Sequence, residues 1–103
     1  MKTNHKVIFG NAKNMKAVSS ESIDLMVTSP PYPMIEMWDE MFAQQSSSVK
    51  KALKIKDGSS AFERMHQVLD PVWNQVYRVL KFGGFACINI GDATRTINGN
   101  FVL

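Results

Sequence analysis

The stretch Ile23–Pro33, with the sequence IDLMVTSPPYP, decides how this chain is expected to fold. An almost continuous apolar run ends in a serine, two prolines, a tyrosine and a third proline. Such a run is typical of a strand that is covered on both faces of a parallel sheet. Pro30 and Pro31 fix two φ angles and remove two backbone donors, so the turn after the strand is stiff. We expect this turn at the carboxyl edge of the sheet, where open α/β folds bind ligands.

The turn carries groups that suit a planar substrate with an amino group. The Ser29 hydroxyl and a freed backbone carbonyl can each accept an N–H bond, and the Tyr32 ring offers a flat face for stacking. A stiff proline-rich loop without a function is an equally good interpretation of these residues alone.

The residues before this stretch predict a βαβ unit. Lys6–Phe9 is a short apolar strand, Gly10 ends it, and Asn11 is a candidate N-cap for a short helix. Ile23–Thr28 is then the second strand, reached by a right-handed crossover.

A helix and a mobile loop are predicted after the prolines. Four apolar side chains recur at helical spacing and favour core packing, with an adaptable ligand surface as the alternative: Met34, Met37, Trp38 and Met41. The segment 43–60 is expected to be a mobile loop because Ser-rich stretches flank its four lysines. These lysines form either a solvated face or a basic segment that binds phosphates: Lys50, Lys51, Lys54 and Lys56.

The longest predicted helix begins at Ser60, where SAFE is typical of a capping box with Glu63. Its apolar face continues across Pro71, which favours a kink over a restart. The glycine pair GG at 83–84 is expected to stop the helix. FACINIGD at 85–92 is then the third strand, and TINGNF at 96–101 carries an Asn–Gly turn signal.

Composition limits the class of protein. A length of 103 residues allows one small domain, and 45% apolar with 20% charged residues excludes disorder. No apolar run reaches the roughly 20 residues of a membrane span, and no secretory signal is present. The single Cys87 fits a reducing cytoplasm and is expected to be a small buried hydrophobe. His5 and His66 lack partners at ligand spacing, so no metal is predicted.

Together these segments resemble the amino-methyltransferases that modify DNA bases with S-adenosylmethionine. SPPY at 29–32 matches the family's catalytic (D/N/S)PPY motif, VIFGNA at 7–12 precedes it, and VWNQVYRVLKFGGFACINIGDAT at 72–94 follows it. The family usually has Pro in place of Phe82, and many relatives have Asp in place of Asn11. The resemblance implies an α/β fold that is part of a Rossmann-like parallel sheet with helices on both faces.

The resemblance also implies direct methyl transfer to the exocyclic amino group of a flipped-out base, within a restriction-modification type system. The serine favours cytosine N4, with adenine N6 as the alternative. The implied catalytic residues are Ser29, Pro30 and Tyr32, and the implied base contacts are Pro31, Tyr32 and Pro33. The implied cofactor contacts are Asn11, Ser29, Pro30 and Asp92. With DNA as the partner, the basic segment described above would supply the phosphate contacts, through Lys50, Lys51, Lys54 and Lys56.

The glycine-rich cofactor loop of the family is missing before the motif. FGNAKN at 9–14 has one glycine, and only 28 residues precede Ser29, fewer than a βαβ unit of about 30 requires. We therefore expect residues 1–103 to be a single partial domain, the N-terminal catalytic half of a permuted enzyme. Such a half is expected to bind S-adenosylmethionine weakly or not at all, to transfer no methyl group alone, and to self-associate or need a partner.

Two other interpretations remain open. A protein-glutamine or RNA amino-methyltransferase would use the same quartet, although those relatives usually carry Asn and an upstream glycine-rich loop. A nucleic-acid-binding or subunit module would keep the fold without the chemistry, and its functional feature would be the lysine segment. A net charge of +3 is compatible with DNA as the partner.

Overall fold

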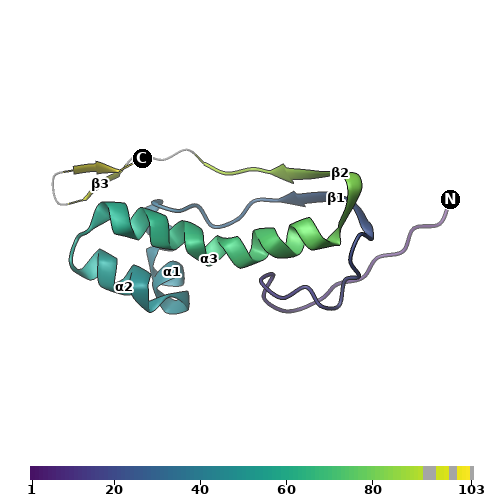
Figure 1. Ribbon diagram of the computed structural model, residues 1–103, viewed down its shortest axis with the longest axis horizontal. Helices are drawn as coiled ribbons and strands as arrows, with labels where there is room; N and C mark the ends of the chain where they lie inside the picture. The colour runs from purple at the N-terminus through teal and green to yellow at the C-terminus, as the bar shows by residue number, and fades with distance from the viewer. Residues whose placement is uncertain (92–94, 98–99, 103) are drawn as a thin grey trace.

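A computed structural model describes residues 1–91, 95–97 and 100–102 (Figure 1). The chain forms, in order, β1 (Ile23–Thr28), the 3-10 helix η1 (Glu36–Trp38), α1 (Asp39–Gln45), α2 (Ser47–Lys54), α3 (Gly58–Val79), β2 (Leu80–Ile88), β3 (Arg95–Ile97) and β4 (Asn100–Val102). β1 and β2 pair in parallel, and the helices connect them. The predicted α/β class with a parallel sheet is confirmed. None of the described helices is long and apolar enough to cross a membrane.

Helices cover one face of the β1–β2 pair. In Figure 1, α3 runs along the pair, and α1 and α2 lie on the same side as α3. The helices that were expected on both faces of the sheet therefore cover only one face in the described part of the chain. The uncovered face, called here the open face, consists of four exposed side chains that alternate along the strands and pair across them: Leu25, Val27, Phe85 and Cys87. The prediction that Cys87 is buried is wrong, because none of the helices in the described part of the chain packs on this side.

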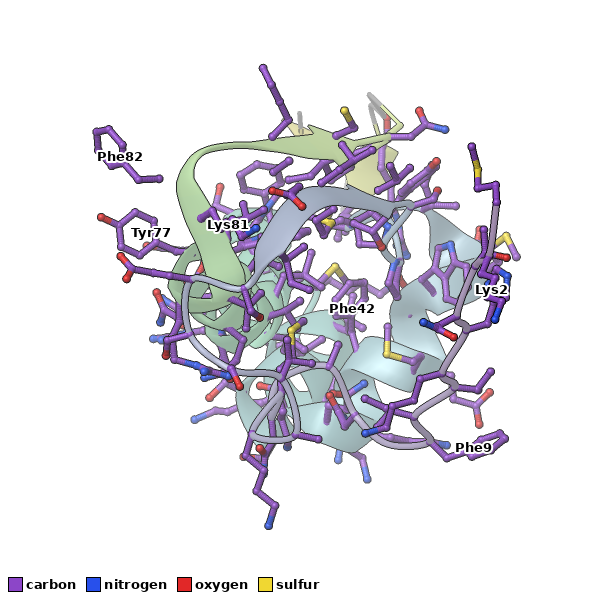
Figure 2. The ribbon with its side chains drawn as sticks, turned by 90° about the vertical axis from the view of Figure 1, so that its right-hand side faces the viewer. Lys2, Phe9, Phe42, Tyr77, Lys81 and Phe82 are labelled. Atoms are coloured by element: carbon purple, nitrogen blue, oxygen red, sulfur yellow. The ribbon has the colours of Figure 1, made fainter. Side chains whose placement is uncertain are left out.

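The core lies between the helices, at the end of the molecule that holds α1 and α2. Phe42, Val49 and Met65 are fully buried there, one from each of α1, α2 and α3 (Phe42 is labelled in Figure 2). The predicted core role of the methionine and tryptophan stripe is correct for three members: Met34 is buried, and Trp38 and Met41 pack against the cluster. Met37 is 76% exposed and does not belong to the core.

Helix α2 occupies the middle of the segment 43–60, where the sequence predicted a loop. The Ser46 hydroxyl caps it by accepting a hydrogen bond from the Val49 N–H at 3.3 Å. Val49 and Ala52 are buried on one face of α2, and its lysines are exposed. Leu53 also packs against the core, so three apolar residues at helical spacing hold this short helix in place.

Helix α3 begins two residues before the predicted start. Its N-cap is Asp57, whose carboxylate accepts hydrogen bonds from the Ser60 N–H at 3.1 Å and the Ser60 hydroxyl at 2.9 Å. The predicted cap at Ser60 is therefore wrong, because a stronger acceptor precedes it. The helix passes through Pro71 without a restart, as expected.

The glycine pair of FGG lies in β2 and does not stop α3, which ends earlier, at Val79. The register of the pair slips here, from Ile23 beside Leu80 to Leu25 beside Phe85. Gly83 has a φ of 81°. A Cβ at Gly84 would lie 3.0 Å from the Lys81 carbonyl oxygen. These glycines therefore allow a bulge in which two backbones approach closely.

The N-terminal segment is irregular. Lys6–Phe9 forms no strand and is exposed, so the predicted first strand and the βαβ unit built on it are wrong. The helix expected after Asn11 is a series of turns. A run of four residues does not hold a strand without a neighbour to pair with. At the other end, β3 and β4 pair antiparallel as the turn signal suggests, but Asn98 and Gly99 of the turn lie outside the described residues.

Candidate active site

The Ser-Pro-Pro-Tyr motif begins directly after the last residue of β1. β1 and β2 both point toward the end of the molecule that holds α1 and α2 (Figure 1). The Asn89 N–H donates to the Thr28 carbonyl at 2.9 Å, which extends the pairing one residue beyond β2. Ser29 therefore stands at the carboxyl edge of the parallel pair, where the sequence placed it.

The motif folds back on itself. The Ser29 Oγ and the Tyr32 hydroxyl oxygen are 3.0 Å apart and share a hydrogen bond. The Ile35 N–H donates to the Tyr32 carbonyl at 3.3 Å, and Met34 takes a positive φ of 70°. The two ends of the turn are thus fixed, and the Ser29 hydroxyl stays exposed.

Pro33, the last of the residues expected to contact the base, is buried in the free chain. Pro33 and Met34 are both buried, and the Met34 N–H points to the sulfur of Met65 at 3.4 Å. Pro33 therefore supports the turn from the inside, and a base contact by Pro33 stays a prediction. Pro31 and Tyr32 are half-buried.

A cavity of about 240 Å³ lies beside the motif. Asn11, Ser29 and Pro30 line it, so three of the four residues expected to contact the cofactor come together. The fourth, Asp92, lies outside the described residues. The helices supply a mostly apolar wall of six side chains: Met41, Gln45, Val68, Leu69, Val72 and Trp73. A polar edge facing an apolar wall suits a ligand with a flat ring and polar substituents.

Arg78 ties the irregular N-terminal segment to α3. Its guanidinium donates to the Met15 carbonyl at 2.8 Å and to the Val18 carbonyl at 3.0 Å. The Gln75 side-chain carbonyl accepts from the Met15 N–H at 3.1 Å. These contacts hold the irregular N-terminal segment beside α3. Asn11 belongs to this segment and lines the cavity. The sequence did not indicate this role, because the partners of Arg78 are far away along the chain.

An ion pair between Arg95 and Asp39 fixes β3. The two terminal nitrogens of Arg95 donate to the two carboxylate oxygens of Asp39, at 2.7 and 2.8 Å. These hydrogen bonds raise the pKa of Arg95 above its ordinary value, so the guanidinium stays charged. β3 is thereby anchored to the first turn of α1.

The four lysines do not line the cavity. Three of them extend from α2 and one follows it, all of them exposed: Lys50, Lys51, Lys54 and Lys56. α2 lies at the end of the molecule toward which the strands point (Figure 1). In the part of the chain that the structure describes, no three His, Cys, Asp or Glu side chains gather as a metal site.

Gly91 is a site residue that the sequence did not identify. A Cβ added at Gly91 would lie 2.8 Å from Cδ2 and 2.9 Å from Cε2 of Tyr32, so the Tyr32 ring rests directly on the glycine. The available signal was a glycine inside the strand predicted at 85–92, which does not reveal its partner.

The family follows from comparison with known proteins. A sequence model of the DNA methylase family, which combines N6 and N4 methyltransferases, matches residues 23–101. The chain belongs to this DNA methylase family. The match begins at the first residue of β1 and includes the motif, the helices and β2.

Two curated relatives of this DNA methylase are Type II methyltransferases. M.MjaI from Methanocaldococcus jannaschii is 52% identical over 98% of this chain and 37% of its own length. M.MthZI from Methanothermobacter thermautotrophicus is 44% identical over all of this chain and 29% of its own length. The chain thus spans about a third of the length of these relatives. No solved structure matches it.

Proposed function

We propose that this DNA methylase chain carries the catalytic motif of an enzyme that transfers a methyl group from S-adenosylmethionine to N4 of cytosine in DNA, in a restriction-modification system. The observation that carries the proposal is the Ser29–Tyr32 turn at the carboxyl edge of the parallel pair, beside the cavity that Asn11 also lines. The names of the two relatives support methyl transfer as the reaction class.

Ser29 and Pro30 would hold the target amino group of a flipped-out base. That nitrogen is a poor nucleophile because its lone pair is delocalised into the ring. The Ser29 Oγ and the Pro30 carbonyl would accept its two N–H bonds, which favours a pyramidal nitrogen with a free lone pair. The nitrogen gains the methyl carbon and finally releases one proton to water. Positioning and electrostatics account for most of the rate enhancement in such a site.

Tyr32 and Pro31 would contact the base itself. The Tyr32 ring is half-buried and one side rests on Gly91, which leaves an aromatic surface for stacking. Stacking would offset part of the unstacking free energy of a flipped base, a few kcal/mol.

Asn11, Ser29 and Pro30 would hold one side of the cofactor. S-adenosylmethionine, when bound, supplies a methyl group on a positively charged sulfur, which keeps the electron pair of the broken carbon–sulfur bond. The donor set fits, since an amide and a hydroxyl face an apolar wall in one cavity. The volume of about 240 Å³ is below the roughly 300–1,000 Å³ of ligand pockets, and weak binding by this chain alone is therefore expected.

Lys50, Lys51, Lys54 and Lys56 would contact DNA phosphates. All four are exposed, and three lie on one short helix at the end of the molecule to which the motif turn also belongs. Such contacts are independent of DNA sequence and orient the protein on the duplex.

A segment-exchanged enzyme tests the proposal. In it, this chain replaces the matching segment of M.MjaI, which is 52% identical to it. We expect this enzyme to transfer labelled methyl groups to DNA. Its Ser29→Ala variant is expected to have a kcat lower by about 10²- to 10³-fold, which is the effect of losing one preorganised hydrogen-bond partner in an active site. Mass spectrometry of digested DNA is expected to show N4-methylcytosine.

Ser59→Ala is the matched control, because Ser59 is exposed in the first turn of α3 and lines no part of the cavity. It should leave kcat unchanged. Full methyl transfer by Ser29→Ala would contradict the catalytic assignment. If the product is N6-methyladenine, the assignment to cytosine is wrong, but the assignment to an amino-methyltransferase still holds.

A further inference from the structure

Three residues at the carboxyl edge form a chain of contacts from β2 to the motif. Gly91 follows β2, the Tyr32 ring rests on its α-carbon, and the Tyr32 hydroxyl is 3.0 Å from the Ser29 Oγ. No larger residue fits at position 91 without displacing the ring, because a Cβ there would lie under 3 Å from two ring carbons.

The strand pairing keeps these three residues in register. The hydrogen bond from the Asn89 N–H to the Thr28 carbonyl, 2.9 Å long, aligns the segment after β2 with the residue before Ser29. Gly91 is two residues beyond that bond, and Tyr32 is three residues beyond Ser29. The ring is thus held between the end of β2 and the turn, and it has little freedom to move sideways.

The hydroxyl of Tyr32 constrains the hydroxyl of Ser29. A serine hydroxyl has one donor proton and two acceptor lone pairs, and it rotates freely unless a partner fixes it. When the Ser29 hydroxyl donates to Tyr32, both Ser29 lone pairs are left to accept hydrogen bonds from a substrate amino group.

We infer that Gly91 is a positioning residue for the motif: it seats the Tyr32 ring so that the Tyr32 hydroxyl orients the Ser29 hydroxyl toward the amino group of the substrate. This inference rests on the proposed function for its catalytic consequence. The seating itself is a property of the free chain.

Proton NMR of the 103-residue chain tests the seating without any methyl transfer. The ring current of an aromatic ring this close to the α-carbon of Gly91 displaces the Gly91 Hα signals from their random-coil positions. The shift is expected to persist in Tyr32→Phe, which keeps the ring, and to vanish in Tyr32→Leu. The same Gly91 Hα positions in wild type and Tyr32→Leu would overturn the inference.

Kinetics of the segment-exchanged enzyme test the consequence. Gly91→Ala is expected to lower kcat by about 100-fold, the scale of a misplaced reacting group. Tyr32→Phe is expected to lower kcat by about 10-fold and leave the KM for DNA unchanged, because it removes one hydrogen bond and no stacking. Gly10→Ala is the control, since a Cβ at Gly10 meets nothing within 4 Å.

A double-mutant cycle separates positioning from damage to the fold. In a Tyr32→Ala background no ring remains to be displaced, so Gly91→Ala is expected to change kcat by less than about twofold. Equal losses in both backgrounds would overturn the inference. Failure of the proposed function has a different signature, either no methyl transfer by the parent enzyme or full transfer by Ser29→Ala.

Discussion

A single carboxylate, that of Asp57, sets the start of α3. Asp57 accepts hydrogen bonds from the backbone N–H and the hydroxyl of Ser60, and these bonds hold its pKa below the ordinary value. The stabilisation is therefore fully present above the ordinary Asp pKa and is lost as the pH falls through the lower pKa of the folded chain. Deprotonated Asp57 is the better cap at neutral pH.

Asp57→Asn tests this pH dependence, because Asn also caps helices but does not titrate. Urea unfolding followed by circular dichroism at about pH 6 and about pH 2.5, on either side of the ordinary Asp pKa, is expected to show a larger loss of stability for wild type than for Asp57→Asn. Other carboxylates titrate equally in both proteins and cancel in the comparison. An equal loss in the two proteins would contradict the assigned role of Asp57.

The sequence could place Ser29 and Tyr32 just after the end of a strand, because apolar runs and prolines act locally. It could not give the contact between Tyr32 and Gly91, since their approach depends on the pairing of β1 with β2. For the same reason Gly83 was expected to end a helix, whereas it lies in a bulge that only the partner strand requires.

At the scale of elements, α2 combines a buried face with an exposed row of lysines. Val49 and Ala52 anchor it to the core, and Lys50, Lys51 and Lys54 face solvent. The sequence predicted a basic segment here but not its helical form. The predicted strand at Lys6–Phe9 does not form, and its apolar side chains are exposed because they pair with no strand among the described residues.

Replacement of the four lysines by Gln tests whether α2 binds DNA. The change covers Lys50, Lys51, Lys54 and Lys56. Fluorescence anisotropy with a labelled duplex at several salt concentrations is expected to show weaker binding. The slope of log K against log salt should fall by about 0.9 for each DNA phosphate that a lysine no longer neutralises. Mutation of phosphate-binding lysines weakens binding uniformly across DNA sequences.

A second variant with the same change in net charge is the control for this experiment. It replaces four lysines of the irregular N-terminal segment by Gln: Lys2, Lys6, Lys13 and Lys16. If DNA attraction depends only on net charge, the salt slope falls equally in both variants. Specific binding of phosphates by α2 predicts a lower slope only in the α2 variant, and an unchanged slope there would contradict the phosphate role.

At the scale of the whole molecule, the α/β class and the order of the principal strand and helix segments followed from the sequence, but the solvent exposure of the sheet did not. The run of β1 predicted cover on both faces, yet Leu25 is 55%, Val27 71% and Phe85 70% exposed. Hydrophobic pattern reports which surface a chain tends to bury, not which partner buries it. The open face is therefore where the properties of the isolated chain are most readily tested.

We expect the isolated chain to self-associate through the open face, because exposed contiguous apolar strands are prone to association. Sedimentation velocity should show species larger than the monomer, increasing with concentration. Val27→Lys combined with Phe85→Lys adds two charges to this face and should restore the monomer. Tyr77→Lys combined with Phe82→Lys is the matched control, since both aromatic side chains are exposed and point away from the body of the molecule (Figure 2). If the Val27/Phe85 variant still associates and the Tyr77/Phe82 variant does not, the interface lies on a different surface. If the wild-type chain is a monomer at high concentration, the prediction of self-association is wrong.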